Sequence, residues 1–136
     1  MSRSIACIDY RDGKVFIAKR QNKGDMANRW EFPGGKLDQG ENDQEAIKRE
    51  MREEFGVNVS VGEKICESTF MHKDKLCYLD AYFVHFEEDG IKRRFSLTEH
   101  TDYRWELLEN IPSLDFVDSD LSIYEKIVNK IKGLGL

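Results

Sequence analysis

The sequence predicts an α/β fold in which a mixed β-sheet lies between helices. Short runs rich in isoleucine, valine and phenylalanine alternate with two segments of helical periodicity. Their order is strand, strand, helix, strands, helix, and no repeat or linker-like stretch interrupts it. At 136 residues the chain is long enough for one real core, so we expect residues 1–136 to form a single domain.

The chain starts with two expected strands, over residues 4–10 and 14–19. The Asp-Gly pair at 12–13 is a strong signal for a hairpin turn between them. Arg20 closes the second strand and, taken alone, reads as a surface residue. The polar loop over 21–29 has the length of a lid.

A helix rich in carboxylates follows a glycine-rich bend, with Asn42 or Asp43 as its expected N-cap. Glu50, Glu53 and Glu54 are spaced i, i+3 and i+4, so a helix brings them about 5–6 Å apart on one face. Like charges so placed repel each other, and folding alone gains nothing from them. A hard divalent cation such as Mg2+ reverses the sign of that interaction, because it prefers oxygen ligands.

The same helix carries an apolar stripe of Ile47, Met51 and Phe55. Glu54 falls within roughly 20° of Ile47 and Glu50 within roughly 60°, whereas the basic residues lie mostly on the far side. Glutamates at the edge of a packing stripe are unusual for a merely solvated face.

The later strands are expected over 57–61 and 65–70, broken by Gly62, and over 76–86. The 76–86 segment is apolar on both faces, which fits a central strand covered on both sides. Asp80 interrupts it and is expected to have a hydrogen-bond partner.

A further strand is expected over 103–105, and the end of the chain predicts an amphipathic helix over 119–133. Asp118, Ser119 or Asp120 would be the N-cap of that helix.

Composition excludes several classes of function. The net charge is −5 with 35% charged residues, so an acidic surface would repel a polyphosphate unless a metal or a local basic cluster bridges the two. There is no basic patch for a nucleic acid polymer. The three cysteines lack metal-ligand spacing and read as free thiols in a reducing compartment. Neither a signal peptide nor a membrane span is expected, which favours a cytoplasmic protein.

Residues 34–57 resemble the Nudix box, the sequence signature of the Nudix hydrolase superfamily. Every position of that pattern is filled, by Gly35, Glu41, Arg49, Glu50, Met51, Glu53, Glu54, Gly56 and Val57. The segment Trp30-Glu31-Phe32-Pro33 ahead of the box and the layout of the remaining chain are most similar to the MutT-like branch. The resemblance implies an α/β/α sandwich, in agreement with the order of elements.

The resemblance also implies a metal site for Mg2+, with Mn2+ as the alternative. Its expected ligands are Glu50, Glu53, Glu54, Glu99 and the carbonyl of Gly34 or Gly35. Either Glu53 or Glu99 would take a proton from the attacking water. Arg49 is expected to fix one glutamate by an ion pair, and Glu41 to support the loop rather than to bind metal.

The implied reaction is hydrolysis of a nucleoside triphosphate to the monophosphate and pyrophosphate. Arg20, Gly35 and Asp120 are the expected substrate contacts, with Asp120 at the edge of the base, where it could face guanine or cytosine. The first hypothesis is a DNA-repair enzyme that removes oxidised nucleotides such as 8-oxo-dGTP. The alternatives are a CTP, dCTP or modified-cytidine pyrophosphohydrolase and a non-catalytic domain that senses a nucleotide. The expected partner is the small-molecule nucleotide, and the chain is expected to be a monomer or a homodimer.

Overall fold

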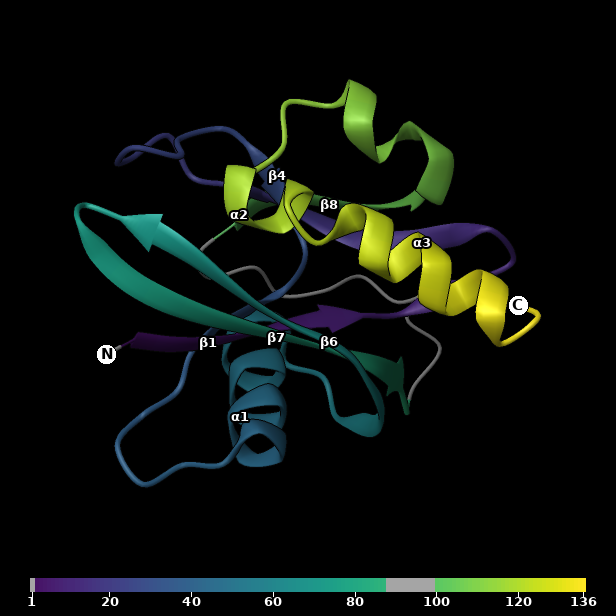
Figure 1. The fold of residues 1–136 in the computed structure, drawn as a ribbon, viewed down its shortest axis with the longest axis horizontal. Helices are drawn as coiled ribbons and strands as arrows, with labels where there is room; N and C mark the ends of the chain where they lie inside the picture. Colours follow the sequence, from purple (N-terminus) through teal and green to yellow (C-terminus); the bar gives the residue numbers. More distant parts are fainter. Residues whose placement is uncertain (1, 88–99) are drawn as a thin grey trace.

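The computed structural model describes residues 2–87 and 100–136 and arranges their strands in two β-sheets (Figure 1). The first sheet has the strand order β5-β1-β7-β6. Its strands are β1 (Ser2–Ile8), β5 (Gly34–Lys36), β6 (Val59–His72) and β7 (Lys75–Phe86). β1 and β7 run parallel, whereas β5 pairs with β1 and β6 with β7 in antiparallel fashion. The mixed sheet predicted from the sequence is therefore confirmed.

A second sheet, which the sequence pattern does not predict, is built around one long strand. Its strands are β2 (Tyr10–Arg11), β3 (Lys14–Arg20), β4 (Trp30–Glu31) and β8 (His100–Leu107). β3 pairs with all three others, each time antiparallel. The β2–β3 turn has φ angles of 48° at Asp12 and 81° at Gly13, the positive pair that a two-residue hairpin loop requires.

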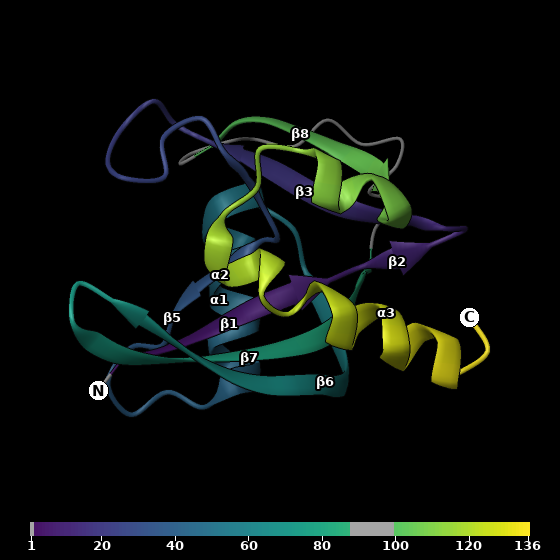
Figure 2. The same ribbon diagram turned by 45° about the horizontal axis from the view of Figure 1, so that its top comes forward.

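Helices cover both faces of the first sheet (Figure 2). They are α1 (Asp43–Phe55), α2 (Asp118–Leu121) and α3 (Tyr124–Gly133), and the 3-10 helix η1 (Leu108–Ser113) precedes α2. Alternate residues of β1 enter two separate cores: Ile5 and Cys7 pack with α1, whereas Ala6 and Ile8 pack with α3. This alternation follows from the two-residue period of a strand and confirms the predicted sandwich.

The strand predicted over 4–10 is divided into β1 and β2. Asp9 lies between them at 1% exposure, and its carboxylate accepts a hydrogen bond from the Phe86 backbone at 3.0 Å and two from Arg11. Because a side chain takes the place of the next backbone partner, the chain leaves the first sheet here. The predicted hairpin turn at Asp12-Gly13 is confirmed, but the hairpin is shorter than predicted, because only β2 of the 4–10 segment pairs with β3.

β6 continues through Gly62, where the sequence predicts a break, so that prediction is wrong. A Cβ at Gly62 would lie 3.3 Å from the Phe83 Cβ on β7, so glycine permits a close approach of the two strands. The pairing shifts between Val61 and Lys64 and again between Lys64 and Cys66. Gly62 thus marks an irregularity within the strand.

The single helix predicted over 119–133 is also wrong, because α2 and α3 are separate helices. Ser122, between them, donates its hydroxyl to the backbone carbonyl of Ser119. A serine that bonds a carbonyl one turn back competes with the regular helical pattern. No helix in the described part of the chain has the length and apolarity needed to cross a membrane.

The predicted side-chain N-cap is absent from both C-terminal helices. Val117 and Ile123 occupy the cap positions, and neither can accept a hydrogen bond through its side chain. The Asp120 carboxylate is directed elsewhere and accepts from the backbone N–H of Phe32 at 2.9 Å.

Candidate functional site

α1 is delimited by local sequence signals. Asn42 is its N-cap: its side chain accepts from Glu45 N at 2.8 Å, while the Glu45 side chain accepts from Asn42 N at 3.0 Å. This reciprocal pair is a capping box. Gly56 ends the helix in the left-handed conformation with φ of 67°. The apolar stripe between these ends is buried against the first sheet.

Glu50, Glu53 and Glu54 of α1 differ strongly in exposure. Glu54 is buried, with 4% of its surface exposed. The Glu50 side chain is 13% exposed and that of Glu53 62% exposed. The sequence correctly placed Glu50 and Glu54 beside the packing stripe, whereas Glu53 lies at the rim.

Arg49 connects this helix to the loop before it. Its Nε and Nη2 donate to the two carboxylate oxygens of Glu41 at 2.7 and 2.9 Å, a bidentate pair. Its Nη1 donates to Glu50 at 2.8 Å and to Glu53 at 3.2 Å. Nη2 also donates to the Lys36 carbonyl at 3.0 Å. The ion pair between Arg49 and a glutamate predicted from the sequence is therefore present.

Glu41 holds the loop, as expected. Besides Arg49, it accepts a hydrogen bond from the backbone N–H of Asp38 at 2.9 Å. The bonds from Arg49 and then from Asp38 lower the pKa of the Glu41 carboxyl to about 2. Its carboxylate is thus committed to positioning Arg49.

The two glycines of β5 are required by close contacts. Gly34 has φ of 153°, and a Cβ there would lie 2.0 Å from the Ile5 carbonyl oxygen. A Cβ at Gly35 would lie 2.7 Å from the carboxyl carbon of Glu50. The bend therefore brings the backbone directly against the Glu50 carboxylate, where any side chain would displace it.

A cleft of about 1240 Å³ unites most of the predicted site residues. Its lining includes Gly34, Gly35, Glu50, Glu53 and Glu54, together with Arg20 and Asp120. The sequence-predicted residue Glu99 lies outside the described residues. Arg49 holds Glu50 and Glu53 by hydrogen bonds and is itself held by Glu41.

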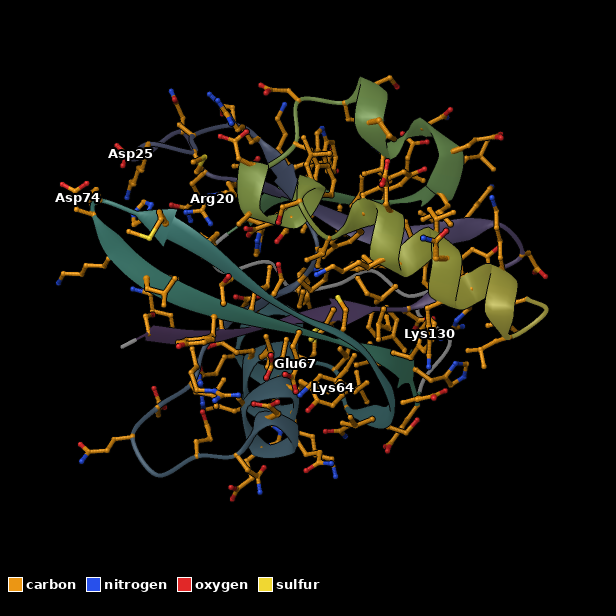
Figure 3. All side chains as sticks on the ribbon, in the orientation of Figure 1. Arg20, Asp25, Lys64, Glu67, Asp74 and Lys130 are labelled. Carbon is orange, nitrogen blue, oxygen red and sulfur yellow. The ribbon has the colours of Figure 1, made fainter. Side chains whose placement is uncertain are left out.

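The tip of the β6–β7 hairpin forms another wall of the cleft, which sequence reasoning did not foresee. Phe70 and Leu79 line it from that side, and Met26 from the loop over 21–29. Lys73 Nζ lies 3.6 Å from Asp25 Oδ2, so this loop meets the hairpin tip near the cleft; Figure 3 shows Asp25 beside that tip. The interpretation of 21–29 as a lid stays a prediction.

Asp120 is 7% exposed and faces the cleft. Burial, followed by the negative charge of Glu31, raises the pKa of Asp120 to about 8, while the bond from Phe32 and the charge of Arg20 act in the opposite direction. At neutral pH this side chain is therefore mainly a neutral acid, which both donates and accepts hydrogen bonds.

Glu31 links the other polar side chains of the cleft, and the sequence analysis assigned it no role. Its Oε1 accepts from Arg20 Nη1 at 3.1 Å, and its Oε2 lies 2.8 Å from His100 Nε2. The available signal was its place in the Trp-Glu-Phe-Pro segment before the box, but the residue types alone do not specify these partners.

The donor set at the glutamate end of the cleft is suited to a hard cation, because it offers carboxylate and peptide oxygens. In the described ranges, 2–87 and 100–136, no three acidic, histidine or cysteine residues converge as a ready metal cluster. Instead the Arg49 guanidinium lies between Glu50 and Glu53. Glu53 would have to turn away from Arg49 to offer both carboxylate oxygens to a metal.

Comparison with known proteins shows the family of the chain. The family model of the NUDIX domain matches residues 2–127. The CTP pyrophosphohydrolase of Escherichia coli (strain K12) is 37% identical over 84 residues, 62% of this chain and 62% of that protein. The 8-oxo-dGTP diphosphatase of Proteus vulgaris is 46% identical over 50 residues, 37% of this chain and 45% of that protein. Each match thus spans less than two thirds of the relative's length.

Solved structures share the fold over nearly the whole chain. The solution structure of the E. coli ORF135 protein superposes with a TM-score of 0.82 at 29% identity, covering 95% of this chain and 89% of that one. The MutT NUDIX hydrolase from Burkholderia pseudomallei has a TM-score of 0.78 at 21% identity, covering 93% and 97%. A Nudix fold with a complete box thus defines the class of protein. The chain belongs to the Nudix family, and the resemblance to its MutT-like members is confirmed.

Proposed function

We propose that this protein is a Mg2+-dependent nucleoside triphosphate pyrophosphohydrolase that releases the nucleoside monophosphate and pyrophosphate. The observation that carries the proposal is the set of side chains that line the cleft. Carboxylates and a side-chain-free bend line it together with Arg20 and the buried Asp120. This combination of side chains would suit a polyphosphate with its metal ion as well as a base.

The phosphate end needs a positive charge, because three glutamates alone would repel a triphosphate. Glu50, Glu54 and, after rotation, Glu53 would hold Mg2+, with a carbonyl of Gly34 or Gly35. When bound, the ion would neutralise phosphate charge and orient the phosphorus for attack by water. Glu53, the most exposed of the three, is the described carboxylate best placed to accept a proton from that water. Glu99 is the alternative base.

For the base, our first candidate is an oxidised guanine, as in 8-oxo-dGTP. The name of the Proteus vulgaris relative supports this choice. An ionised Asp120 accepts from two N–H groups, as the guanine N1–H and exocyclic amine present them, whereas a protonated Asp120 pairs with one donor and one acceptor.

The second candidate is CTP or a modified cytidine triphosphate. Cytosine presents an amine donor beside a ring-nitrogen acceptor, which matches a carboxylic acid with its proton. The pKa of Asp120, raised to about 8, favours that form at neutral pH. The name of the E. coli relative supports the same choice.

The test is a panel of 8-oxo-dGTP, dGTP, CTP, dCTP and 5-methyl-dCTP, assayed for pyrophosphate with and without Mg2+. We expect Mg2+-dependent pyrophosphate release, with the highest kcat/KM for either the oxidised guanine or one of the cytidine nucleotides. A protein that binds nucleotides but releases neither pyrophosphate nor phosphate would instead be a non-catalytic sensor.

A further inference from the structure

Three polar residues from three neighbouring strands form a hydrogen-bonded network beside the cleft. Arg20 ends β3, Glu31 ends β4 and His100 begins β8. Glu31 stands in the middle, with one carboxylate oxygen 3.1 Å from Arg20 Nη1 and the other 2.8 Å from His100 Nε2. Figure 3 shows Arg20 near the tip of the β6–β7 hairpin, where it lines the cleft.

A break in strand pairing puts His100 at this place. The β3–β8 pairing is regular up to Lys19 and Asp102, and then shifts so that Arg20 faces His100 rather than Thr101. Such a bulge re-aims one side chain. His100 thereby turns inward, where its side chain is only 2% exposed.

His100 also packs against α1. Its ring stacks on Phe55 of α1, with centroids 5.4 Å apart and planes 15° apart. Opposite Glu31 on β3 stands Ala18, which is fully buried. A stacked imidazole bonded to a carboxylate leaves that carboxylate few alternative orientations.

We propose that His100 is a positioning residue for substrate binding, which acts on the nucleotide through Glu31 and Arg20. By occupying one oxygen of Glu31, it presents the other oxygen to Arg20 and so fixes the guanidinium in the cleft. The inference rests on the proposed function only in taking the ligand of Arg20 to be a nucleoside triphosphate. Because Arg20 is the member of this network that we take to contact the nucleotide, the network should govern binding rather than the hydrolytic step.

The test is a double-mutant cycle with His100→Leu, Arg20→Ala and the combined variant, measured as KM and kcat with Mg2+. We expect His100→Leu to raise KM about tenfold, the effect of losing one charge-assisted bond, with kcat within twofold of wild type. In the Arg20→Ala background the same substitution should change KM no further, because His100 acts through Arg20. His100→Gln, whose amide N–H replaces Nε2–H, should recover most of the binding.

Thr101→Ala is the matched control, since this exposed residue lies next to His100 on β8 but is not part of the network of Arg20, Glu31 and His100. It should behave as wild type. If His100→Leu does not fold, Glu31→Gln serves as the test variant, because it weakens the bond to Arg20 and the bond to His100.

Three results would overturn the inference. They are an unchanged KM, a KM effect that multiplies with that of Arg20→Ala, and a fall in kcat alone. Binding of a non-hydrolysable triphosphate analogue, measured as Kd on the same variants, separates this inference from the proposed function. If wild type binds the analogue but hydrolyses no nucleotide, the proposed function fails, and the cycle in Kd still decides on His100.

Discussion

Arg49 Nη1 lies 2.8 Å from Glu50 Oε1, while the other nitrogens of the same guanidinium bind Glu41. Glu50 is thereby tied to the loop that precedes α1, and its carboxyl group occupies the space beside Gly35 of β5 that a side chain would fill. Two residues without a proposed metal contact, Arg49 and Glu41, thus decide where a central carboxylate points.

Arg49→Lys keeps the positive charge but removes the bidentate bond to Glu41. Glu50 then loses its fixed orientation, and we expect kcat/KM to fall roughly 10–100-fold, the usual cost of losing a residue that orients a metal ligand. The Mg2+ concentration for half-maximal activity should rise as well. Steady-state kinetics over a Mg2+ titration measures both. Arg52→Lys, at an exposed position of the same helix, is the control and should match wild type.

Gly35→Ala should abolish most activity at little cost in stability. The new methyl group would lie 2.7 Å from the carboxyl carbon of Glu50, and the flexible glutamate side chain would move aside rather than the backbone. Thermal unfolding and pyrophosphate release, measured on the same preparation, test this. Gly133→Ala, where a Cβ meets nothing within 4 Å, should leave activity unchanged. Equal activity of both variants would show that Glu50 need not keep its present position.

Asp120→Asn should alter the pH dependence of stability. Burial raises the pKa of Asp120 from 3.8 to about 8, so between these pH values the folded protein holds a proton that the unfolded chain releases. The contribution of protonated Asp120 to the free energy of unfolding is complete below about pH 4. It is lost as pH rises toward 8, by at most about 1.4 kcal/mol per pH unit.

Asparagine has no such proton, so the Tm of Asp120→Asn relative to wild type should increase between pH 5 and pH 8. Asp118→Asn, with a side chain that is 75% exposed on the same helix, is the control and should run parallel to wild type. Parallel curves for Asp120→Asn would mean that Asp120 is ionised throughout this range.

Local pattern was sufficient for the elements that carry the chemistry. The stripe of α1, its cap near Asn42 and the central strand β7 follow from spacing within a few residues. The filled Nudix box then identified the family and the glutamates.

Contacts between distant residues account for what the sequence did not predict. The division of the first strand depends on Asp9 bonding Phe86, 77 residues away. Asp120 is no cap because it bonds Phe32, 88 residues away, and Glu31 meets His100 across 69 residues. The periodicity of a single segment cannot predict which distant residue it will contact.

The central claim is that the glutamates of α1 and Mg2+ together allow water to cut a triphosphate. The most direct measurement is Mg2+-dependent pyrophosphate release by wild type and Glu53→Gln over the nucleotide panel. We predict turnover by wild type, lost on chelation, and none by Glu53→Gln, whose thermal unfolding stays as in wild type because this side chain is 62% exposed. Undiminished turnover by Glu53→Gln in the presence of Mg2+ would contradict the account.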